Sequence, residues 1–173
     1  MAASLCVNLE SPSCTEAAAL VDELDRDLLA RYPRHNIHGV DLEKLEAGQG
    51  FFVVARLDGR PVGCGAVRVL EPGIGEVKRM YVRPEARRRG VAQAVLATLE
   101  KTAHAMGLHT LRLETGTRQP EAKALYEKQG YYPIPCFGEY ISDPFSLCYE
   151  KALCRKIVEA PADTIGTQVG RSL

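Results

Sequence analysis

The sequence predicts a single α/β domain built on a mixed β-sheet. Apolar residues alternate with polar ones in several short segments and recur at helical spacing in longer ones. In the middle of the chain these segments follow the order strand, helix, strand, helix, which implies a pair of parallel strands. The chain has 173 residues, a length that fits one domain with one core.

In the first half of the chain, period-two alternation predicts strands at residues 5–9, 51–56, 61–69 and 76–82. Helical spacing runs from residue 15 to residue 32, and Pro33 ends this helix. Residues 34–40 are expected to form a loop. The dipeptide Asp58-Gly59 between two of the strands predicts a tight hairpin turn with positive φ.

The second half contains two predicted helices, at residues 92–106 and 120–129. It also contains two predicted strands, at residues 108–114 and 148–153. Gly107 and Gly130 follow the last helical residues, where glycine commonly ends a helix. We expect the domain to span residues 1–154. Residues 155–173 show little apolar periodicity and are expected to form a mobile tail.

Composition and charge argue against a disordered or fibrous protein and against attraction of the whole chain to nucleic acid or membranes. Hydrophobic residues make up 46% and charged residues 25% of the chain, as in an ordinary soluble globular protein. The 22 basic and 22 acidic residues cancel, so no overall field draws the chain onto nucleic acid or a membrane. Locally, the window from Lys78 to Arg89 carries a net charge of about +5, whereas residues 10–46 are acidic. We therefore expect local electrostatic recognition, with neither nucleic acid nor membrane as a partner.

The cysteines and the N-terminus bear on metal binding and location. The six cysteines contain no Cys-x-x-Cys pair and have no nearby paired histidines. This pattern supports neither a zinc site nor a thioredoxin-type redox pair, so we expect free thiols and no metal. The N-terminus lacks a basic region followed by a long apolar run, and no stretch is long enough to span a bilayer. We expect a cytoplasmic protein.

The crossing from strand to helix at residues 87–92 predicts an anion site. The first N–H groups of a helix have no partner inside the helix and lie at the positive end of its dipole. Gly90 and Ala92 would let a ligand reach the backbone. Positive charge comes from three consecutive arginines, Arg87, Arg88 and Arg89. The chain lacks the Gly-x-x-x-x-Gly-Lys-Ser/Thr pattern of nucleotide hydrolases, so a different phosphate ligand is expected.

This segment resembles the pyrophosphate loop of the GCN5-related N-acetyltransferase (GNAT) superfamily, which reads Arg/Gln-x-x-Gly-x-Gly/Ala. Arg87, Gly90 and Ala92 match that pattern. Three further blocks agree in order and spacing, namely the strand at 76–82, Leu111-Arg112-Leu113-Glu114, and Ala122-x-x-Leu125-Tyr126 followed by Gly130-Tyr131. The resemblance covers roughly residues 50–153, and its specificity lies in the combination of blocks. The Phe-Gly-x-Tyr loop within residues 130–140 also resembles that of a group of small bacterial acetyltransferases.

The resemblance implies a mostly antiparallel sheet, flanked by helices, in which the strand at 76–82 splays away from the strand at 111–114. The pantetheine arm of acetyl-coenzyme A would lie in this gap and pair with the main chain of Met80 and Val82. Gln119 stands where the family often has an asparagine that contacts the cofactor. The cofactor-binding residues implied in this way are Met80, Tyr81, Val82, Arg87, Arg88, Arg89, Gly90, Val91, Ala92, Gln119 and Tyr126.

The resemblance also implies direct transfer of the acetyl group to an amine acceptor in a ternary complex. Glu76 occupies the strand position where several members carry a general-base glutamate, and a solvated carboxylate at a strand edge is the alternative. Tyr126 occupies the Leu-Tyr position that would protonate the departing thiolate, and a tyrosine of the core is its alternative. An acetyl-enzyme on Cys64 or Cys136 is not favoured, because neither has an evident histidine partner.

Acceptor-binding residues are expected in two loops. In this superfamily the loop after the first helix commonly lines the acceptor pocket, which makes His35 and His38 candidates, with surface polarity as the alternative. Tyr140 either closes over the acceptor or packs its loop on the sheet. A small amine, an amino acid, an antibiotic, a polyamine and a protein lysine all remain open as acceptors. Homodimers are frequent in the family and are one expected assembly.

Two functions from other classes compete with this interpretation. The basic window could neutralise nucleic-acid phosphates, although the neutral overall charge counts against that. A coenzyme A sensor without catalysis would bind the cofactor and release no thiol with any acceptor.

Overall fold

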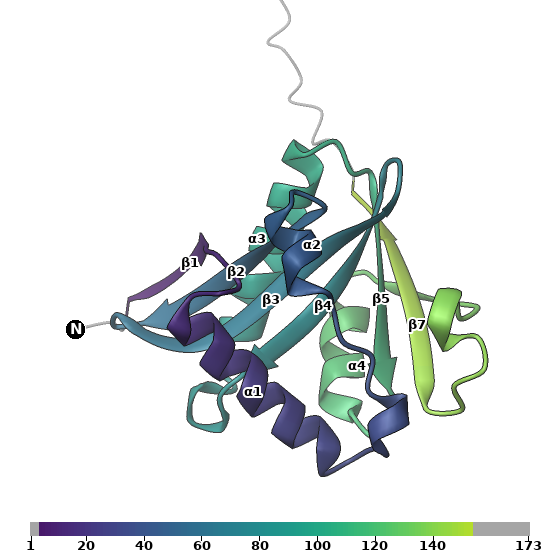
Figure 1. Cartoon of the computed structure of the whole chain (residues 1–173), viewed down its shortest axis with the longest axis horizontal. Helices are drawn as coiled ribbons and strands as arrows, with labels where there is room; N and C mark the ends of the chain where they lie inside the picture. Colours follow the sequence, from purple (N-terminus) through teal and green to yellow (C-terminus); the bar gives the residue numbers. More distant parts are fainter. Residues whose placement is uncertain (1–3, 154–173) are drawn as a thin grey trace, which may run out of the picture.

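The computed structural model describes residues 4–153, which fold as one α/β domain on a seven-stranded mixed sheet (Figure 1). The predicted tail at residues 155–173 lies outside the described residues. The strands are β1 (Leu5–Leu9), β2 (Gly50–Leu57), β3 (Arg60–Glu71), β4 (Ile74–Val82), β5 (Thr110–Gly116), β6 (Tyr132–Ile134) and β7 (Ser146–Ala152). The sheet order is β1-β2-β3-β4-β5-β7-β6, and β4 and β5 form the parallel pair that the sequence predicts.

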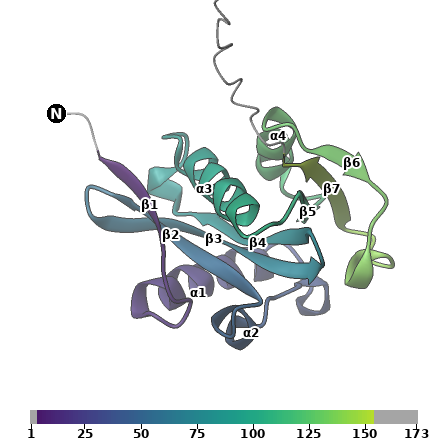
Figure 2. The same ribbon diagram turned by 90° about the horizontal axis from the view of Figure 1, so that it is seen from above.

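Four helices cover the sheet, α1 (Thr15–Leu29), α2 (Leu42–Glu46), α3 (Val91–Ala105) and α4 (Pro120–Lys128). The described residues also contain three short 3₁₀ turns, η1 (Arg34–Asn36), η2 (Pro84–Ala86) and η3 (Gly138–Tyr140). Figure 2 shows α1 and α2 on one face of the sheet, α3 on the other, and α4 beside the end that carries β5, β6 and β7. Among residues 4–153, no helix combines the length and apolarity that crossing a membrane requires.

The core has two layers because side chains of a strand point alternately to opposite faces. On β2, Val53 packs in the cluster with α3, whereas its neighbours Phe52 and Val54 pack in the cluster with α1. Gly65 on β3 lies under α3, where an added Cβ would come within 2.8 Å of Val95. A residue without a side chain at this position therefore lets α3 approach the sheet closely.

The parallel pair is hydrogen-bonded along only part of its length. Its register runs from Ile74↔Thr110 to Val77↔Leu113 and stops there, although both strands continue. We call these residues the paired half, and Lys78–Val82 with Glu114–Gly116 the splayed half. In the splayed half β4 continues along β3 and β5 continues along β7. This confirms the splayed pair that the family resemblance implies.

A β-bulge lies where the two strands separate. Arg79 has a φ of +57°, and the register between β3 and β4 shifts between Cys64 and Ala66, opposite this residue. Lys78 and Arg79 are neighbours, yet Lys78 reaches Tyr140 of η3 while Arg79 reaches Asp25 of α1. Bulges bend a strand and re-aim its side chains, which is what separates β4 from β5 here.

Several predicted boundaries shift, and five short elements, α2, β6 and the turns η1, η2 and η3, were not predicted. The first helix ends at Leu29 rather than Tyr32, and the last strand starts at Ser146 rather than Cys148. Helix α2 follows the predicted loop and is capped by Asp41, whose side chain accepts from the N–H groups of Glu43 and Lys44. Strand β6 and the turn η3 complete the segment before β7. Short elements of this kind carry little periodic signal.

Candidate active site

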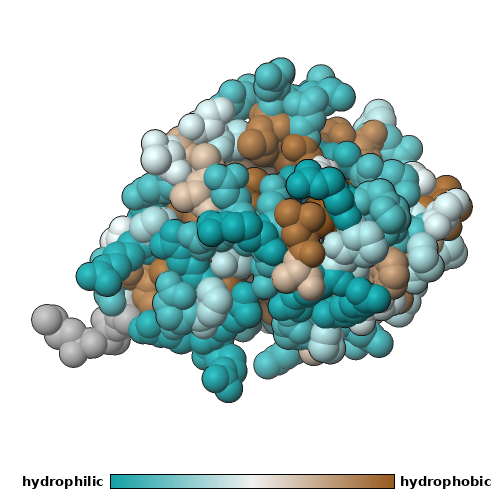
Figure 3. Space-filling model, turned by 60° about the horizontal axis from the view of Figure 1, so that its bottom comes forward, coloured by the Kyte–Doolittle hydropathy of each residue, from teal (hydrophilic) through white to brown (hydrophobic). Residues whose placement is uncertain are grey.

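One cavity of about 720 Å³ opens where the parallel strands separate. Its walls come from α1, the segment 36–38, the splayed half of β4, the turn before α3, the end of β5, α4 and the segment 143–145. Figure 3, turned so that the lower end of Figure 1 comes forward, shows apolar surface lying between hydrophilic residues on this side. A cavity with apolar walls and few polar groups is the usual form of a small-molecule site.

The turn before α3 forms one end of the cavity. Gly90 is the N-cap residue, has a φ of +79° and offers no capping side chain, so the first amides of α3 have no side-chain partner. An added Cβ on Gly90 would meet no atom within 4 Å, so the backbone faces open space. Arg87 and Arg88 line the cavity, whereas Arg89 is exposed and does not. The turn therefore has the open backbone and positive charge that a diphosphate requires.

The middle of the cavity lies between the splayed strands. Met80, Tyr81 and Val82 line it from β4, and Gln119 and Tyr126 line it from the start and middle of α4. In the described chain these β4 residues pair with β3 alone, so the other edge of the strand is free of a neighbouring strand. An extended ligand can use such an edge as an additional strand would.

Tyr126 lines the middle of this cavity from α4. Its ring packs edge-to-face against Tyr131 at a centroid distance of 5.8 Å, and only 5% of its surface is exposed. Burial raises the pKa of Tyr126 above its ordinary value of 10.0, so the hydroxyl keeps its proton at neutral pH. The hydroxyl of Tyr126 has no hydrogen bond to another residue within 4–153. It is therefore available to a ligand.

Glu114, at the carboxyl end of the pairing between β4 and β5, also lines the cavity. Its Oε1 accepts a hydrogen bond of 2.8 Å from the hydroxyl of Ser146. Burial raises the pKa of Glu114 above its ordinary value of 4.5, against the hydrogen bond from Ser146 and the charge of Lys78. Glu114 was not among the catalytic residues predicted from the sequence. The available signal was its place at the end of a parallel strand, where ligands of α/β sheets commonly bind.

Glu76, the predicted general base, lies outside the cavity lining in the paired half. Its side chain is 0% exposed, and both carboxylate oxygens are engaged. Oε2 accepts from Nε of Arg68 at 2.6 Å, and Oε1 accepts from the hydroxyl of Tyr140 at 2.5 Å. The ion pair with Arg68 and the hydrogen bond from Tyr140 make Glu76 part of a buried network.

Tyr140 and Lys78 complete this network beside the part of the cavity that His38 and Asp143 line, where the sequence predicts the acceptor and which we call the acceptor end. Lys78 donates to the Tyr140 hydroxyl at 2.5 Å and itself lines the cavity, whereas Tyr140 is 1% exposed and does not. Burial lowers the pKa of Lys78 below its ordinary value of 10.5, although the charge of Glu76 opposes this. The geometry favours the packing alternative for Tyr140, since its ring lies beneath the cavity wall.

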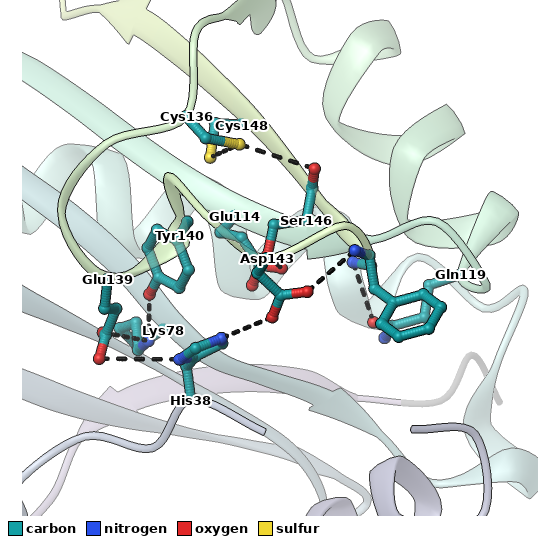
Figure 4. Close-up of polar contacts among 12 residues, drawn as sticks. His38, Lys78, Glu114, Gln119, Cys136, Glu139, Tyr140, Asp143, Ser146 and Cys148 are labelled. Carbon is teal, nitrogen blue, oxygen red and sulfur yellow. Dashed lines mark hydrogen bonds and ion pairs between the residues drawn. The ribbon is translucent and has the colours of Figure 1, made fainter. Parts of the chain in front are cut away.

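The acceptor end is built from segments distant in sequence (Figure 4). His38 lines the cavity, and its Nε2 lies 2.8 Å from Oδ2 of Asp143 while Nδ1 lies 3.7 Å from Glu139. Burial alone would raise the pKa of Asp143, but its hydrogen bonds with His38 and the N–H of Phe145 outweigh burial and lower it. His35 is exposed and does not line the cavity. Of the two histidine candidates, the structure therefore favours His38.

Five further side chains that line the cavity are apolar or aromatic, and they are Leu24, Leu28, Tyr32, Ile37 and Phe145. The rings of Tyr32 and Phe145 meet edge-to-face at 5.9 Å, and the guanidinium of Arg118 lies 4.7 Å from the Phe145 ring centroid. Within residues 4–153, no cluster of three or more His, Cys, Asp or Glu side chains could hold a metal ion.

Comparisons with known proteins agree with this geometry. The family model described as "Acetyltransferase (GNAT) family" matches residues 17–131. An IAA acetyltransferase of Azospirillum brasilense is 45% identical over 145 residues, which cover 83% of this chain and 95% of that protein. An uncharacterised N-acetyltransferase of Bacillus subtilis, YsnE, is 31% identical over 85% of this chain and 99% of its own length.

Solved structures share the fold. The putative acyl-CoA N-acyltransferase of Klebsiella pneumoniae superposes with a TM-score of 0.77 at 35% identity, covering 87% of this chain and 98% of that one. The putative acetyltransferase yncA of Salmonella typhimurium, solved with its cofactor acetyl-CoA, has a TM-score of 0.67 at 17% identity over 91% and 98% of the two chains. The match to the family model and the identity to these relatives place the chain among the acetyltransferases of the GNAT family, as an acyltransferase that uses acetyl-coenzyme A as its co-substrate.

Proposed function

We propose that this protein transfers the acetyl group of acetyl-coenzyme A directly to the nitrogen of an amine that carries an apolar group. The observation that carries the proposal is that one cavity joins the turn before α3, the open edge of β4, and Glu114 with Tyr126. A diphosphate fits the open amides at Gly90, and an extended pantetheine fits the edge formed by Met80–Val82. The apolar wall at the other end leaves room for the acceptor.

In this proposal a residue of the chain acts as the general base for the amine that receives the acetyl group. A lysine-like ammonium has a pKa of about 10.4, so most acceptor molecules must lose a proton before they can react. Glu114 has its carboxylate in the cavity, and burial raises its pKa toward the range useful for proton transfer near neutral pH. In this proposal Glu114 replaces Glu76 as the base, because Glu76 is closed off by Arg68 and Tyr140.

The chain also supplies a side chain that donates a proton and a second side chain that orients the acceptor amine. Bound acetyl-coenzyme A supplies the thioester carbonyl that the amine attacks. The hydroxyl of Tyr126, protonated at neutral pH, donates to the sulfur as it departs. His38, fixed by Asp143, contacts the acceptor from the opposite wall. Holding the two reactants in one cavity removes much of the entropic cost of their meeting.

The experiment is an acceptor panel followed by coenzyme A release, with aromatic and aliphatic amines, amino acids, polyamines, lysine peptides and IAA. Mass spectrometry of the product locates the acetyl group. We expect acetylation of nitrogen, with turnover rising as the apolar group of the amine becomes larger. Acetyl-coenzyme A without acceptor should leave the intact mass of the protein unchanged. A stable acetyl-protein, or a product acetylated on oxygen, would contradict direct N-acetyl transfer.

The same experiment addresses the two competing functions. Tight coenzyme A binding without thiol release on any acceptor would favour a sensor. The nucleic-acid alternative loses much of its basis, because three cations of the basic window, Lys78, Arg79 and Arg83, are engaged with Tyr140, Asp25 and Glu23. Homodimerisation and a cytoplasmic location stay predictions.

A further inference from the structure

Two cysteine sulfurs lie beside the acceptor end of the cavity. Cys136 belongs to the segment between β6 and η3, and Cys148 belongs to β7. Their Sγ atoms are 2.8 Å apart, compared with about 2.04 Å in a formed disulfide. Figure 4 shows the pair next to Ser146 and Glu114. Both cysteines are free thiols, so this contact is a non-bonded one.

The two thiols differ in accessibility. Cys136 is partly exposed, whereas Cys148 is 3% exposed. Burial, followed by the hydrogen bond with Cys136, raises the pKa of Cys148. The thiol of Cys148 donates to Sγ of Cys136, and Cys136 lies 3.6 Å from the carbonyl oxygen of Ser146. An oxidant from solvent therefore meets Cys136 first and finds Cys148 in place behind it.

We propose that Cys136 and Cys148 form a redox modification site that a hydroperoxide, such as hydrogen peroxide, converts into a disulfide. The thiolate of Cys136 attacks one peroxide oxygen, an S–O bond forms as the O–O bond breaks, and water leaves after protonation. The sulfur of Cys148 then attacks the oxidised Cys136 sulfur, an S–S bond forms, and the hydroxyl departs as water with the thiol proton. The two thiols lose two electrons, and the peroxide is reduced to two waters.

The disulfide would fix a loop that serves the site. Residues 137–147 lie between the two cysteines and contain Tyr140, Asp143 and Ser146. Tyr140 holds Glu76 and Lys78, Asp143 holds His38, and Ser146 holds Glu114. Closing this loop covalently removes conformational freedom chiefly from the unfolded chain and ties these contacts to β7. The turn before α3 lies outside the loop, so coenzyme A binding should not depend on the bridge.

The other described cysteines lack this arrangement. Cys64 is fully buried, burial raises its pKa to about 12, and its thiol donates to the carbonyl oxygen of Arg79. Cys6 is exposed, and its sulfur accepts only from the side chain of Asn8 among residues 4–153. Cys6 is therefore a matched control, since it is a reachable thiol without a thiol neighbour within the described chain.

The test uses the full chain, reduced and freed of reductant, and then treated with increasing hydrogen peroxide. We expect the intact mass to fall by about 2 Da, the two hydrogens lost on disulfide formation, without accumulation of a stable oxygen adduct at Cys136. Peptide mapping should recover Cys136 linked to Cys148, and dithiothreitol should restore the mass. Cys6→Ser should behave like the parent. Cys136→Ser and Cys148→Ser should each lose the linked peptide.

Thermal unfolding gives a second readout that does not depend on acetyl transfer. The oxidised parent should melt roughly 5 °C or more above the reduced parent, while both bind coenzyme A equally. Sulfinic acid at Cys136 without a linked peptide would overturn the proposal. A bridge that joins either residue to a different cysteine, or a link that leaves the melting temperature unchanged, would overturn it as well.

Discussion

The two halves of the β4–β5 pair contain the same residue type in very different surroundings. Glu76 lies in the paired half, is 0% exposed, and shares its oxygens with Arg68 and Tyr140. Glu114 lies in the splayed half, faces the cavity, and keeps one hydrogen bond, from Ser146. Of these two carboxylates, the one in the paired half is enclosed by partners inside the protein, and the one in the splayed half borders the cavity.

Two tyrosines show the same contrast. Tyr140 bridges Lys78 and Glu76 inside the network, and burial raises its pKa, followed by the charge of Glu76. Tyr126 is also a buried residue, but its hydroxyl has no hydrogen-bond partner in residues 4–153. Burial alone therefore does not separate a structural residue from a catalytic one. The difference lies in whether the polar group is satisfied inside the protein.

The largest effect is expected from Glu114→Gln, which removes the proposed base. Turnover at neutral pH should fall by roughly 10²- to 10⁴-fold, which is the usual rate acceleration that a positioned general base contributes. In the parent, kcat/KM should fall at acid pH with an apparent pKa above 4.5, because burial raises the pKa of Glu114. The variant should lack this acid limb. An unchanged pH profile in the variant would assign the base elsewhere.

The same substitution should not destabilise the fold. Because the pKa of Glu114 is raised in the folded state, this group stabilises the fold fully only below its ordinary value of 4.5. That contribution is lost as pH rises through the folded pKa, and the neutral Gln avoids the cost of a buried charge. Urea unfolding at pH 7.5 should therefore show equal or greater stability for Glu114→Gln.

Tyr126→Phe should slow the chemical step by about 10²-fold while coenzyme A affinity stays the same. The ring keeps its contact with Tyr131, and only the proton donor is lost. Rapid-quench measurement of the first turnover separates this effect from product release. Tyr140→Phe is the control, since it removes the hydroxyl shared by Lys78 and Glu76 and should lower stability rather than the rate of the chemical step. Equal first-turnover rates in parent and Tyr126→Phe would remove its catalytic role.

Glu76→Gln should act on stability. Replacing a buried carboxylate weakens the pair with Arg68 and leaves Lys78 with less compensation, at a cost of about 1–3 kcal/mol in unfolding free energy. This loss is smaller than that for breaking a fully buried ion pair, because the Arg68 side chain is 30% exposed and water screens its charge. Urea titration measures this loss. Turnover well below the melting temperature should change much less than in Glu114→Gln, and the reverse ranking would restore Glu76 as the base.

The smallest effect is expected from Gly90→Ala compared with Gly107→Ala. Both glycines have φ in the left-handed region, +79° and +87°, and an added Cβ meets no atom at either. Each variant should therefore lose about 1 kcal/mol of stability from backbone strain. Only Gly90→Ala places a methyl group beside the amides that receive the diphosphate, so its Kd for coenzyme A should rise about tenfold in calorimetry. Equal Kd values would move the phosphate site away from this turn.

Much of the fold follows from local sequence. The long helices have apolar residues at helical spacing, and Asp58 and Gly59 do adopt positive φ, at +51° and +78°. The phosphate turn was predictable because helix N-termini and small residues act through the backbone, whatever the surrounding structure. The short helix α2 and strand β6 were not predicted, since five and three residues are too few to establish a period.

The sequence by itself determined that the chain folds around a parallel pair, and it predicted an anion site where β4 crosses to α3. It did not determine which glutamate faces the cavity, because that depends on where the hydrogen bonds between β4 and β5 stop. Nor did it bring His38 to Asp143, or Cys136 to Cys148, since β7 reaches these positions by inserting between β5 and β6. Local propensity acts over a few residues, whereas a polar side chain becomes structural or catalytic through the partners that the tertiary fold brings to it.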